Sequence, residues 1–247
     1  MCGIAGSINS ELDASALHNA QMHRGPDAQT SLKIDNVHMV HNRLSIIDAQ
    51  GGAQPMQRGT LIVTYNGEIY NHMDLRREHN LSCATHSDTE TLLAMFEKHG
   101  EDCLPFLDGM FAFAIYDTEK KTLFIARDRA GEKPLYIYQH SQKLIFASEL
   151  NALRSVIKTQ TDEESIGEFL ATGVMFGRST PYQNIEELEP GHKLTINTQT
   201  LNSHCEAWYS IIEKFESPSL LHSFNECLEW VNAVSYTHLT LPTIYSV

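Results

Sequence analysis

Residues 111–128 read FAFAIYDTEKKTLFIARD and contain two apolar segments, 111–117 and 122–128, on either side of a charged connection. Both segments are short and rich in aromatic and β-branched residues, which pack well on a pleated sheet. Short strands separated by a polar turn are typical of a β-hairpin. This stretch therefore predicts two neighbouring antiparallel strands.

Similar apolar segments lie on both sides of this hairpin, namely LIVTY at 61–65, LYIYQ at 135–139 and LIFASEL at 144–150. The last two follow the hairpin closely, and the turn-like stretches RAGEKP and HSQK separate them. Short strands in such close succession favour hairpin connections. We therefore expect a mainly antiparallel sheet.

Three helices are predicted between and after the strands. In residues 87–101, Ser87 precedes Glu90 by three positions, which is the spacing of a capping box. Residues 162–173 carry apolar side chains at helical spacing before a glycine, and residues 217–231 begin with Ser-Pro. Strands and helices without a regular βαβ alternation predict an α+β or layered architecture.

The composition excludes several classes of protein. The 247 residues are 42% hydrophobic and 20% charged, as in an ordinary globular protein, and no apolar run approaches the length of a membrane span. A formal net charge of −13 argues against a nucleic-acid partner, because phosphate contacts need clustered Lys and Arg. The N-terminus lacks the pattern of a secretory signal, so we expect a cytoplasmic protein.

The cysteines and histidines do not predict a disulfide framework or a metal site. The count of five cysteines is odd, and none forms a C-x-x-C pair. The 13 histidines show no ligand spacing such as H-E-x-x-H. A cysteine with a chemical role here is expected to act as a lone nucleophile. The cysteines are Cys2, Cys83, Cys103, Cys205 and Cys227.

Cys2, in the opening MCGIAG, has two interpretations. A cysteine in a short apolar strand is usually a packing residue. A nucleophilic thiol, whose ordinary pKa is about 8.5, needs a base beside it. Removal of Met1 would turn the α-amine of Cys2, with an ordinary pKa of about 7.7 to 8.0, into that base; a histidine, as in papain-like enzymes, is the alternative.

Asn66 and Gly67 also have two interpretations. Asn-Gly is the strongest short signal for a hairpin turn. The same pair could supply an amide side chain and a closely approaching backbone N–H to an oxyanion formed by nucleophilic attack. The adjacent Glu68 and the extended-looking residues 69–71 are not explained by a turn alone.

Arg43 and Asp88 could hold the two charged groups of an amino acid. The planar guanidinium of Arg43 suits a carboxylate, and the carboxylate of Asp88 suits an ammonium group. Each residue taken singly also has a structural explanation. Arg43 could form a structural salt bridge, and Asp88 could place a favourable charge at a helix start.

The order of several motifs resembles one family, the glutaminase domain of glutamine-dependent asparagine synthetases, which belongs to the class II amidotransferases with an N-terminal nucleophile. The resemblance extends from Cys2 to His192. The motifs that carry it are Cys2-Gly3-Ile4, HRGPD, RLSIID, GGAQPM, YNGEIYNH, SDTE, DGMFAFAIYD, ARDRAGEKPLY and ASEL.

The resemblance implies a four-layer αββα sandwich with two antiparallel sheets and a thiol nucleophile at Cys2. It implies an oxyanion hole formed by Asn66 and Gly67. It further implies that glutamine is bound by residues from three of the motifs. These are Arg43, Leu44, Ser45, Ile46, Ile47, Asn66, Gly67, Glu68 and Asp88.

The same resemblance divides the chain into three parts. We expect the amidotransferase domain at 1–192, a linker and the start of a synthetase domain at 193–231, and a non-native tail at 232–247. The tail has no Asp, Glu, Lys or Arg, and it resembles translated adapter sequence, although an ordinary terminal strand is the alternative. The Ser-Gly-Gly-x-Asp-Ser loop of the family's ATP-binding domain does not occur in the chain.

Two functions follow as hypotheses. The first is a glutaminase that converts L-glutamine to glutamate and ammonia through a Cys2 thioester and itself needs no cofactor. ATP and Mg²⁺ would then be needed only by the missing synthetase domain, which would act in cis, and the acceptor carboxylate and a homodimeric state stay open. The second is a truncated, non-catalytic binding or scaffold module.

Overall fold

The computed structural model describes residues 1–48 and 50–211. Met1–Tyr209 form one compact unit, and Ser210–Val247 are assigned to a second, of which only the first two residues are described. The predicted helix at 217–231, the predicted tail at 232–247 and Cys227 lie outside the described residues.

Sheet A has six strands and includes the N-terminal strand of the chain. Each of its neighbouring pairs runs antiparallel. In spatial order the strands are β10 (Ile185–Glu187), β8 (Tyr136–His140), β9 (Lys143–Ala147), β1 (Gly3–Ile8), β3 (Val37–Arg43) and β2 (Ala28–Ile34).

Sheet B also has six strands and contains the predicted hairpin. Its neighbouring pairs are antiparallel, and Asp117 pairs with Thr122 at the hairpin end. In spatial order the strands are β12 (Ser203–Ala207), β11 (His192–Asn197), β7 (Thr122–Arg127), β6 (Gly109–Asp117), β5 (Leu61–Ile69) and β4 (Met56–Arg58).

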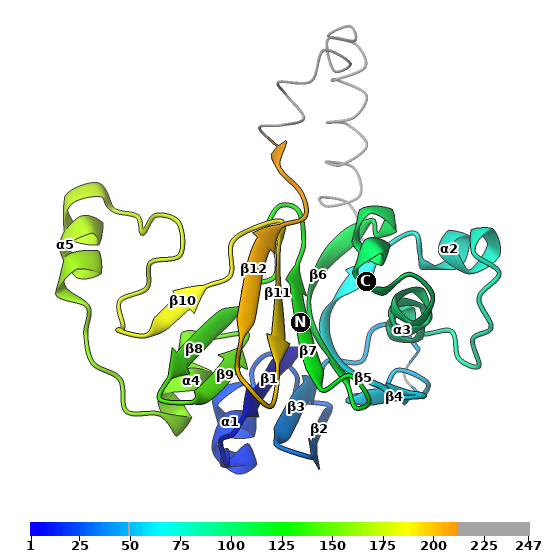
Figure 1. Ribbon diagram of the computed structural model, residues 1–247, viewed down its shortest axis with the longest axis horizontal. Helices are drawn as coiled ribbons and strands as arrows, with labels where there is room; N and C mark the ends of the chain where they lie inside the picture. The colour runs from blue at the N-terminus through cyan, green and yellow to red at the C-terminus, as the bar shows by residue number, and fades with distance from the viewer. Residues whose placement is uncertain (49, 212–247) are drawn as a thin grey trace, which may run out of the picture. The chain divides into compact units, whose positions relative to one another are not determined.

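Helices cover the outer face of each sheet (Figure 1). Helices α1 (Ala14–Ala20) and α4 (Leu150–Val156) pack against sheet A, whereas α3 (Asp88–His99) packs against sheet B. Helix α2 (His72–Glu78) and the 3-10 helix η1 (Gly100–Phe106) contact α3. The predicted α+β class and the four-layer αββα arrangement with two antiparallel sheets are therefore confirmed.

The alternation of side chains along the strands explains the layers, since successive residues of a strand point to opposite faces. On β6, Ala112 and Ala114 belong to the core between the sheets, whereas Phe111 and Phe113 belong to the core under α3. Every one of these four residues is fully buried. The apolar run is continuous in sequence because both faces of the strand are covered.

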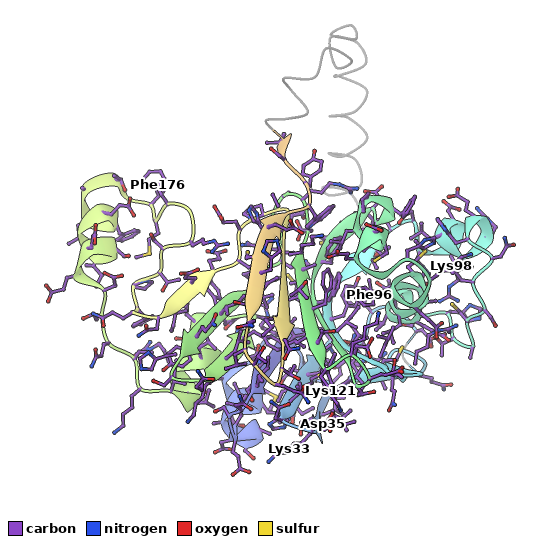
Figure 2. All side chains as sticks on the ribbon, viewed as in Figure 1. Lys33, Asp35, Phe96, Lys98, Lys121 and Phe176 are labelled. Atoms are coloured by element: carbon purple, nitrogen blue, oxygen red, sulfur yellow. The ribbon has the colours of Figure 1, made fainter. Side chains whose placement is uncertain are left out.

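One end of the sandwich is closed by polar contacts between the sheets. Asp35, in the turn between β2 and β3, accepts hydrogen bonds from Lys121 Nζ and from the Tyr116 hydroxyl, each at 2.7 Å. Figure 2 shows Lys121 and Asp35 next to each other at this end. Because Lys121 and Tyr116 belong to the β6–β7 hairpin, these contacts join sheet B to sheet A at this end.

The predicted helix α3 begins at its expected cap. The Ser87 hydroxyl oxygen accepts a hydrogen bond from the backbone N–H of Thr89 at 3.2 Å. The capping box is not completed, because the Glu90 carboxylate accepts hydrogen bonds from the backbone N–H groups of Ala84 and Thr85 instead. Glu90 thus holds the preceding loop rather than the Ser87 backbone.

Helix α5 (Glu163–Thr172) has the predicted limits but not a covered apolar face. Asp162 caps its start, and Gly173 ends it with a φ of 80°. Phe169 is half-exposed and Leu170 is 78% exposed. Figure 1 shows α5 apart from the other helices, and Phe176, labelled beside it in Figure 2, is exposed as well.

Across residues 1–48 and 50–211, the structure contains no helix that is both long enough and apolar enough to cross a membrane.

Candidate active site

A polar pocket lies where strands of both sheets and one helix come together. It is formed at the start of β1, the end of β3 and the loop after it, the last part of β5 and the start of α3. Its lining residues are Met1, Cys2, Arg43, Leu44, Ile46, Ile47, Gly52, Gln54, Tyr65, Asn66, Gly67, Glu68, Ser87, Asp88, Thr89, Met110 and Lys133.

Cys2 is half-buried and lies immediately before β1. Its Sγ is 3.4 Å from the backbone nitrogen of Leu44, which can donate to it, and 3.6 Å from the Leu44 carbonyl oxygen. Burial raises the pKa of the Cys2 thiol, while the Leu44 backbone contact and the charge of Arg43 act in the opposite direction. The thiol therefore needs a nearby base to become a nucleophile near neutral pH.

The backbone of Cys2 is held by a buried arginine. Arg24 donates from Nε to the Cys2 carbonyl oxygen at 3.0 Å, and from Nη1 to Glu149 at 2.8 Å. On the next residue but one, the Ile4 backbone N–H donates to the Ser148 hydroxyl at 3.0 Å. These contacts fix the direction in which the N-terminal residues enter the pocket.

Arg43 is the last residue of β3 and is largely buried. Its Nη2 donates to the Asp48 carbonyl oxygen at 2.7 Å, which turns the guanidinium toward the loop that follows the strand. Asp48 in turn accepts from the backbone N–H groups of Gly51 and His86 at 2.8 and 2.9 Å. The loop that borders the pocket is thereby tied to the segment before α3.

Asn66 and Gly67 lie inside β5 and do not form a turn. They pair with Ala112 and Phe111 of β6, so the hairpin-turn interpretation is wrong here. A Cβ on Gly67 would overlap the carbonyl oxygen of Met110, which explains why this position requires glycine. Asn66 is 1% exposed, and its Nδ2 has no hydrogen-bond partner within residues 1–48 and 50–211.

Asp88 is the first residue of α3, and its carboxylate is already hydrogen-bonded. Oδ2 accepts from the Tyr65 hydroxyl at 2.7 Å and from the Ile69 backbone N–H at 3.1 Å, and Oδ1 accepts from the Thr89 N–H at 2.9 Å. Burial raises the pKa of Asp88, and these hydrogen bonds oppose the rise. Burial likewise raises the pKa of Glu68, and the nearby charge of Asp88 adds to it.

Eight of the nine residues that the resemblance assigns to glutamine binding line this one pocket, and Cys2 lines it as well. Ser45 does not line it, and its backbone N–H donates to Asp27 Oδ2 at 2.7 Å. Ile46 lines the pocket although it is 73% exposed.

Several lining residues were not singled out from the sequence. Gln54 holds the pocket wall, because its Oε1 accepts from the Tyr65 backbone N–H at 2.6 Å and its Nε2 donates to Thr89 Oγ1 at 3.3 Å. Lys133, in the loop between β7 and β8, reaches the pocket from a distant part of the sequence. Both residues lie within the quoted motifs GGAQPM and ARDRAGEKPLY, which was the available signal.

Comparison with known proteins gives the family. The sequence model of the glutamine amidotransferase domain matches residues 1–209, and the chain belongs to this family. It is 34% identical over 221 residues to asparagine synthetase 3 (glutamine-hydrolysing) of Bacillus subtilis, covering 82% of this chain and 36% of that protein. It is 42% identical over 171 residues to asparagine synthetase B (glutamine-hydrolysing) of Escherichia coli, covering 64% of this chain and 31% of that protein.

These matches confirm the resemblance to the glutaminase domain of asparagine synthetases. The chain spans about a third of the length of these two relatives. Among solved structures, the glutamine phosphoribosylpyrophosphate amidotransferase of Bacillus subtilis, complexed with ADP and GMP, matches with a TM-score of 0.60. That match covers 84% of this chain and 49% of the other at 20% identity, and it supports the fold.

Proposed function

We propose that this chain hydrolyses L-glutamine to glutamate and ammonia at the pocket that contains Cys2. The observation that carries the proposal is the buried Nδ2 of Asn66, which has no partner among the described residues and lies in the same pocket as the Cys2 thiol. A buried amide N–H without a partner costs free energy in the free protein. An oxyanion formed beside the thiol would supply the missing acceptor.

The proposed reaction starts after Met1 has been removed. The α-amine of Cys2 takes the thiol proton, and the thiolate attacks the side-chain amide carbon of glutamine. The resulting oxyanion accepts hydrogen bonds from Asn66 Nδ2 and the Gly67 backbone N–H. The carbon–nitrogen bond then breaks as the α-ammonium returns its proton to the leaving ammonia, and water cleaves the thioester to give glutamate and the free thiol.

Charged side chains at the pocket suit the α-carboxylate and α-ammonium groups of glutamine. Arg43 offers a guanidinium to the carboxylate, with the backbone of residues 44–47 beside it. Asp88 and Glu68 offer negative charge to the ammonium. A carboxylate has about four acceptor positions, so the three donors already bound to Asp88 leave room for one more.

The names of the longer relatives include glutamine hydrolysis. We propose that the ammonia made here likewise serves an ATP- and Mg²⁺-dependent amidation of a carboxylate by a synthetase domain joined in cis, in the cytoplasm. The relatives' names give asparagine as the product, which makes aspartate the expected acceptor, and the glutaminase pocket does not distinguish aspartate from other acceptor carboxylates.

The proposal is tested by glutamate release from L-glutamine, with the intact mass recorded to establish that Met1 is absent. Cys2→Ala and Cys2→Ser should abolish turnover while the thermal unfolding midpoint stays the same. Cys83→Ser is the matched control, since Cys83 is also half-buried but does not line the pocket. Acid-quenched wild type should carry one glutamyl group on the Cys2 peptide.

The alternative of a non-catalytic module makes the opposite prediction. A chain that lacks Met1, keeps its fold and releases no glutamate above the level of Cys2→Ala would refute the glutaminase. A papain-like mechanism with a histidine base predicts turnover even when Met1 is retained. The structure gives that mechanism no support, because no histidine lines the pocket among the described residues.

A further inference from the structure

Lys133 is a buried cation beside the N-terminus. The residue is 4% exposed, and its Nζ donates to Met1 Sδ at 3.2 Å. None of the ion pairs among residues 1–48 and 50–211 includes Lys133. Its charge therefore faces the pocket without a directly paired carboxylate.

The loop that carries Lys133 is held by one aspartate. Asp128 is 1% exposed, and its Oδ1 accepts from the backbone N–H groups of Ala130 and Glu132 at 3.0 and 2.9 Å. Its Oδ2 accepts from the N–H groups of Lys133 and Phe111 at 3.0 and 3.1 Å. The backbone of Lys133 is thus fixed to the sheet, which limits how far the ammonium can move.

Covalent geometry limits the distance from this ammonium to the backbone nitrogen of Cys2. Lys133 Nζ is 3.2 Å from Met1 Sδ, and Met1 precedes Cys2 directly. Even with the Met1 side chain fully extended, standard bond lengths place Nζ within about 10 Å of the Cys2 nitrogen. That nitrogen becomes the α-amine when Met1 is removed.

Other charges face the same nitrogen and partly compensate one another. Arg24 is paired with Glu149, and Arg43 donates to the Asp48 carbonyl. Burial lowers the pKa of Lys133, and the nearby carboxylates of Glu132, Asp128 and Glu68 oppose this lowering. The remaining charged groups at the pocket, or beside the entry of the N-terminus, are Asp27, Glu68 and Asp88.

We propose that Lys133 is a positioning residue that keeps the α-amine of Cys2 uncharged near neutral pH, so that it can act as the base of the glutaminase reaction. This role rests on the function proposed above. An ammonium group disfavours a second positive charge nearby, and this repulsion is strong where water is largely excluded. A base that is already protonated cannot take the proton of the Cys2 thiol.

The amino terminus in the present structure shows the same influences. The pKa of the Met1 α-amine is lowered, first by burial and then by the charges of Arg24 and Lys133, against the opposing charges of Cys2 and Asp27. Removal of Met1 leaves the α-amine on Cys2, whose carbonyl oxygen accepts a hydrogen bond from Arg24 and whose nitrogen lies within about 10 Å of Lys133 Nζ.

The first experiment measures the pKa of the new amine without requiring activity. Full chains that carry Cys2→Ala and have lost Met1 are acetylated with acetic anhydride across the pH range, and the N-terminal peptide is quantified by mass spectrometry. Lys133→Met should raise the apparent pKa of the α-amine by about half a unit to one unit. Lys133→Arg, which keeps the charge, and the exposed control Lys143→Met should leave it within about 0.2 units.

The sign of the shift separates charge from burial. Methionine is less polar than lysine and by itself would lower the pKa of a nearby amine, so a rise must come from the lost charge. An unchanged or lower pKa in Lys133→Met would overturn the proposal. Lys133→Gln provides a second uncharged variant if Lys133→Met does not fold.

The second experiment follows kcat/KM for glutamine hydrolysis against pH with an intact Cys2. Lys133→Met should move the acidic limb upward by the same amount, and Lys133→Arg should restore it. A higher KM with an unmoved limb would mean that Lys133 contacts the substrate instead, which contradicts the proposal. If wild type shows no glutaminase activity, the proposed function fails, but the acetylation result still decides what Lys133 does to the amine.

Discussion

The last part of β5 and the start of α3 face the same pocket but differ in their hydrogen bonding. At the start of α3, the Asp88 carboxylate accepts three hydrogen bonds from within the protein. On β5, the equally buried Asn66 has a side-chain nitrogen with no partner among the described residues. One group is already satisfied in the free protein, whereas the other is left with an unused donor.

This difference separates structural from catalytic contributions. A satisfied buried carboxylate stabilises the fold, and its removal leaves donors without acceptors. An unused buried donor makes no stabilising hydrogen bond in the free protein but is available to charge that develops in a reaction. The two regions should therefore respond in opposite ways to substitution.

The largest expected effect is on the rate of Asn66→Ala. The loss of one oxyanion donor typically lowers kcat by about a hundredfold to a thousandfold. The free energy of unfolding should change by less than about 1 kcal/mol, since no hydrogen bond of Nδ2 is lost. Glutamate release and urea unfolding measure the two quantities. A large loss of stability with an unaffected rate would show that Asn66 serves the fold and not the reaction.

Asp88→Ala should lower stability as well as remove the proposed contact with the ammonium group of glutamine. It leaves the Tyr65 hydroxyl and the Ile69 N–H buried without an acceptor, which should lower the free energy of unfolding by about 3 kcal/mol. Asp88→Asn keeps one acceptor oxygen and should lose less. Urea unfolding at pH 7 checks both, and a change below about 1 kcal/mol for Asp88→Ala would show that the carboxylate does not hold this wall.

A buried histidine of sheet A gives a prediction on the pH dependence of stability. Burial lowers the pKa of His41, on β3, to about 4 from an ordinary 6.5. Between these values the unfolded chain binds a proton that the folded chain does not, so stability falls as the pH decreases below about 6.5. The expected loss from pH 7 to pH 5 is about 2 kcal/mol. Denaturant unfolding at both pH values measures it.

His41→Gln should remove this contribution to the pH dependence, and the exposed His204→Gln is the control. An equal slope in wild type and His41→Gln would mean that His41 is not the group that titrates.

The smallest expected effect belongs to Ser87→Ala, at the cap of α3. Loss of the hydrogen bond from the Thr89 N–H to the Ser87 hydroxyl should cost about 1 kcal/mol. Ser87→Asp, which also accepts at a helix start, should be close to wild type. Thermal unfolding of both variants measures the loss of the cap. A fall in the rate of glutamate release would instead show that the substitution disturbs the neighbouring Asp88.

The residue pattern predicted the β6–β7 hairpin, because both strands have a typical strand composition and are joined by a clear turn, whereas the four layers followed only from the family resemblance. It also predicted the ends of α5, where Asp162 and Gly173 are local signals. It did not predict that Leu170 would be exposed, since helical spacing shows which face is apolar but not whether another element covers it.

The candidate site could be predicted only in part for the same reason. Cys2 and Arg43 have recognisable chemistry at their own positions. Asn66-Gly67 has a strong local turn signal, and pairing with β6 overrides it. Gln54 and Lys133 lie within family motifs, but their places in the pocket depend on contacts with other segments, and the motifs by themselves do not show which of their residues face it.

The place of Met1 has a practical consequence for producing the protein. Its side chain lines the pocket and accepts a hydrogen bond from Lys133, so residues added before Cys2 would run through the same space. An affinity tag at this end would block both the amine and the route of the substrate unless a protease leaves Cys2 as the first residue. Correct removal would expose a 1,2-aminothiol, to which a fluorescent label can be attached selectively.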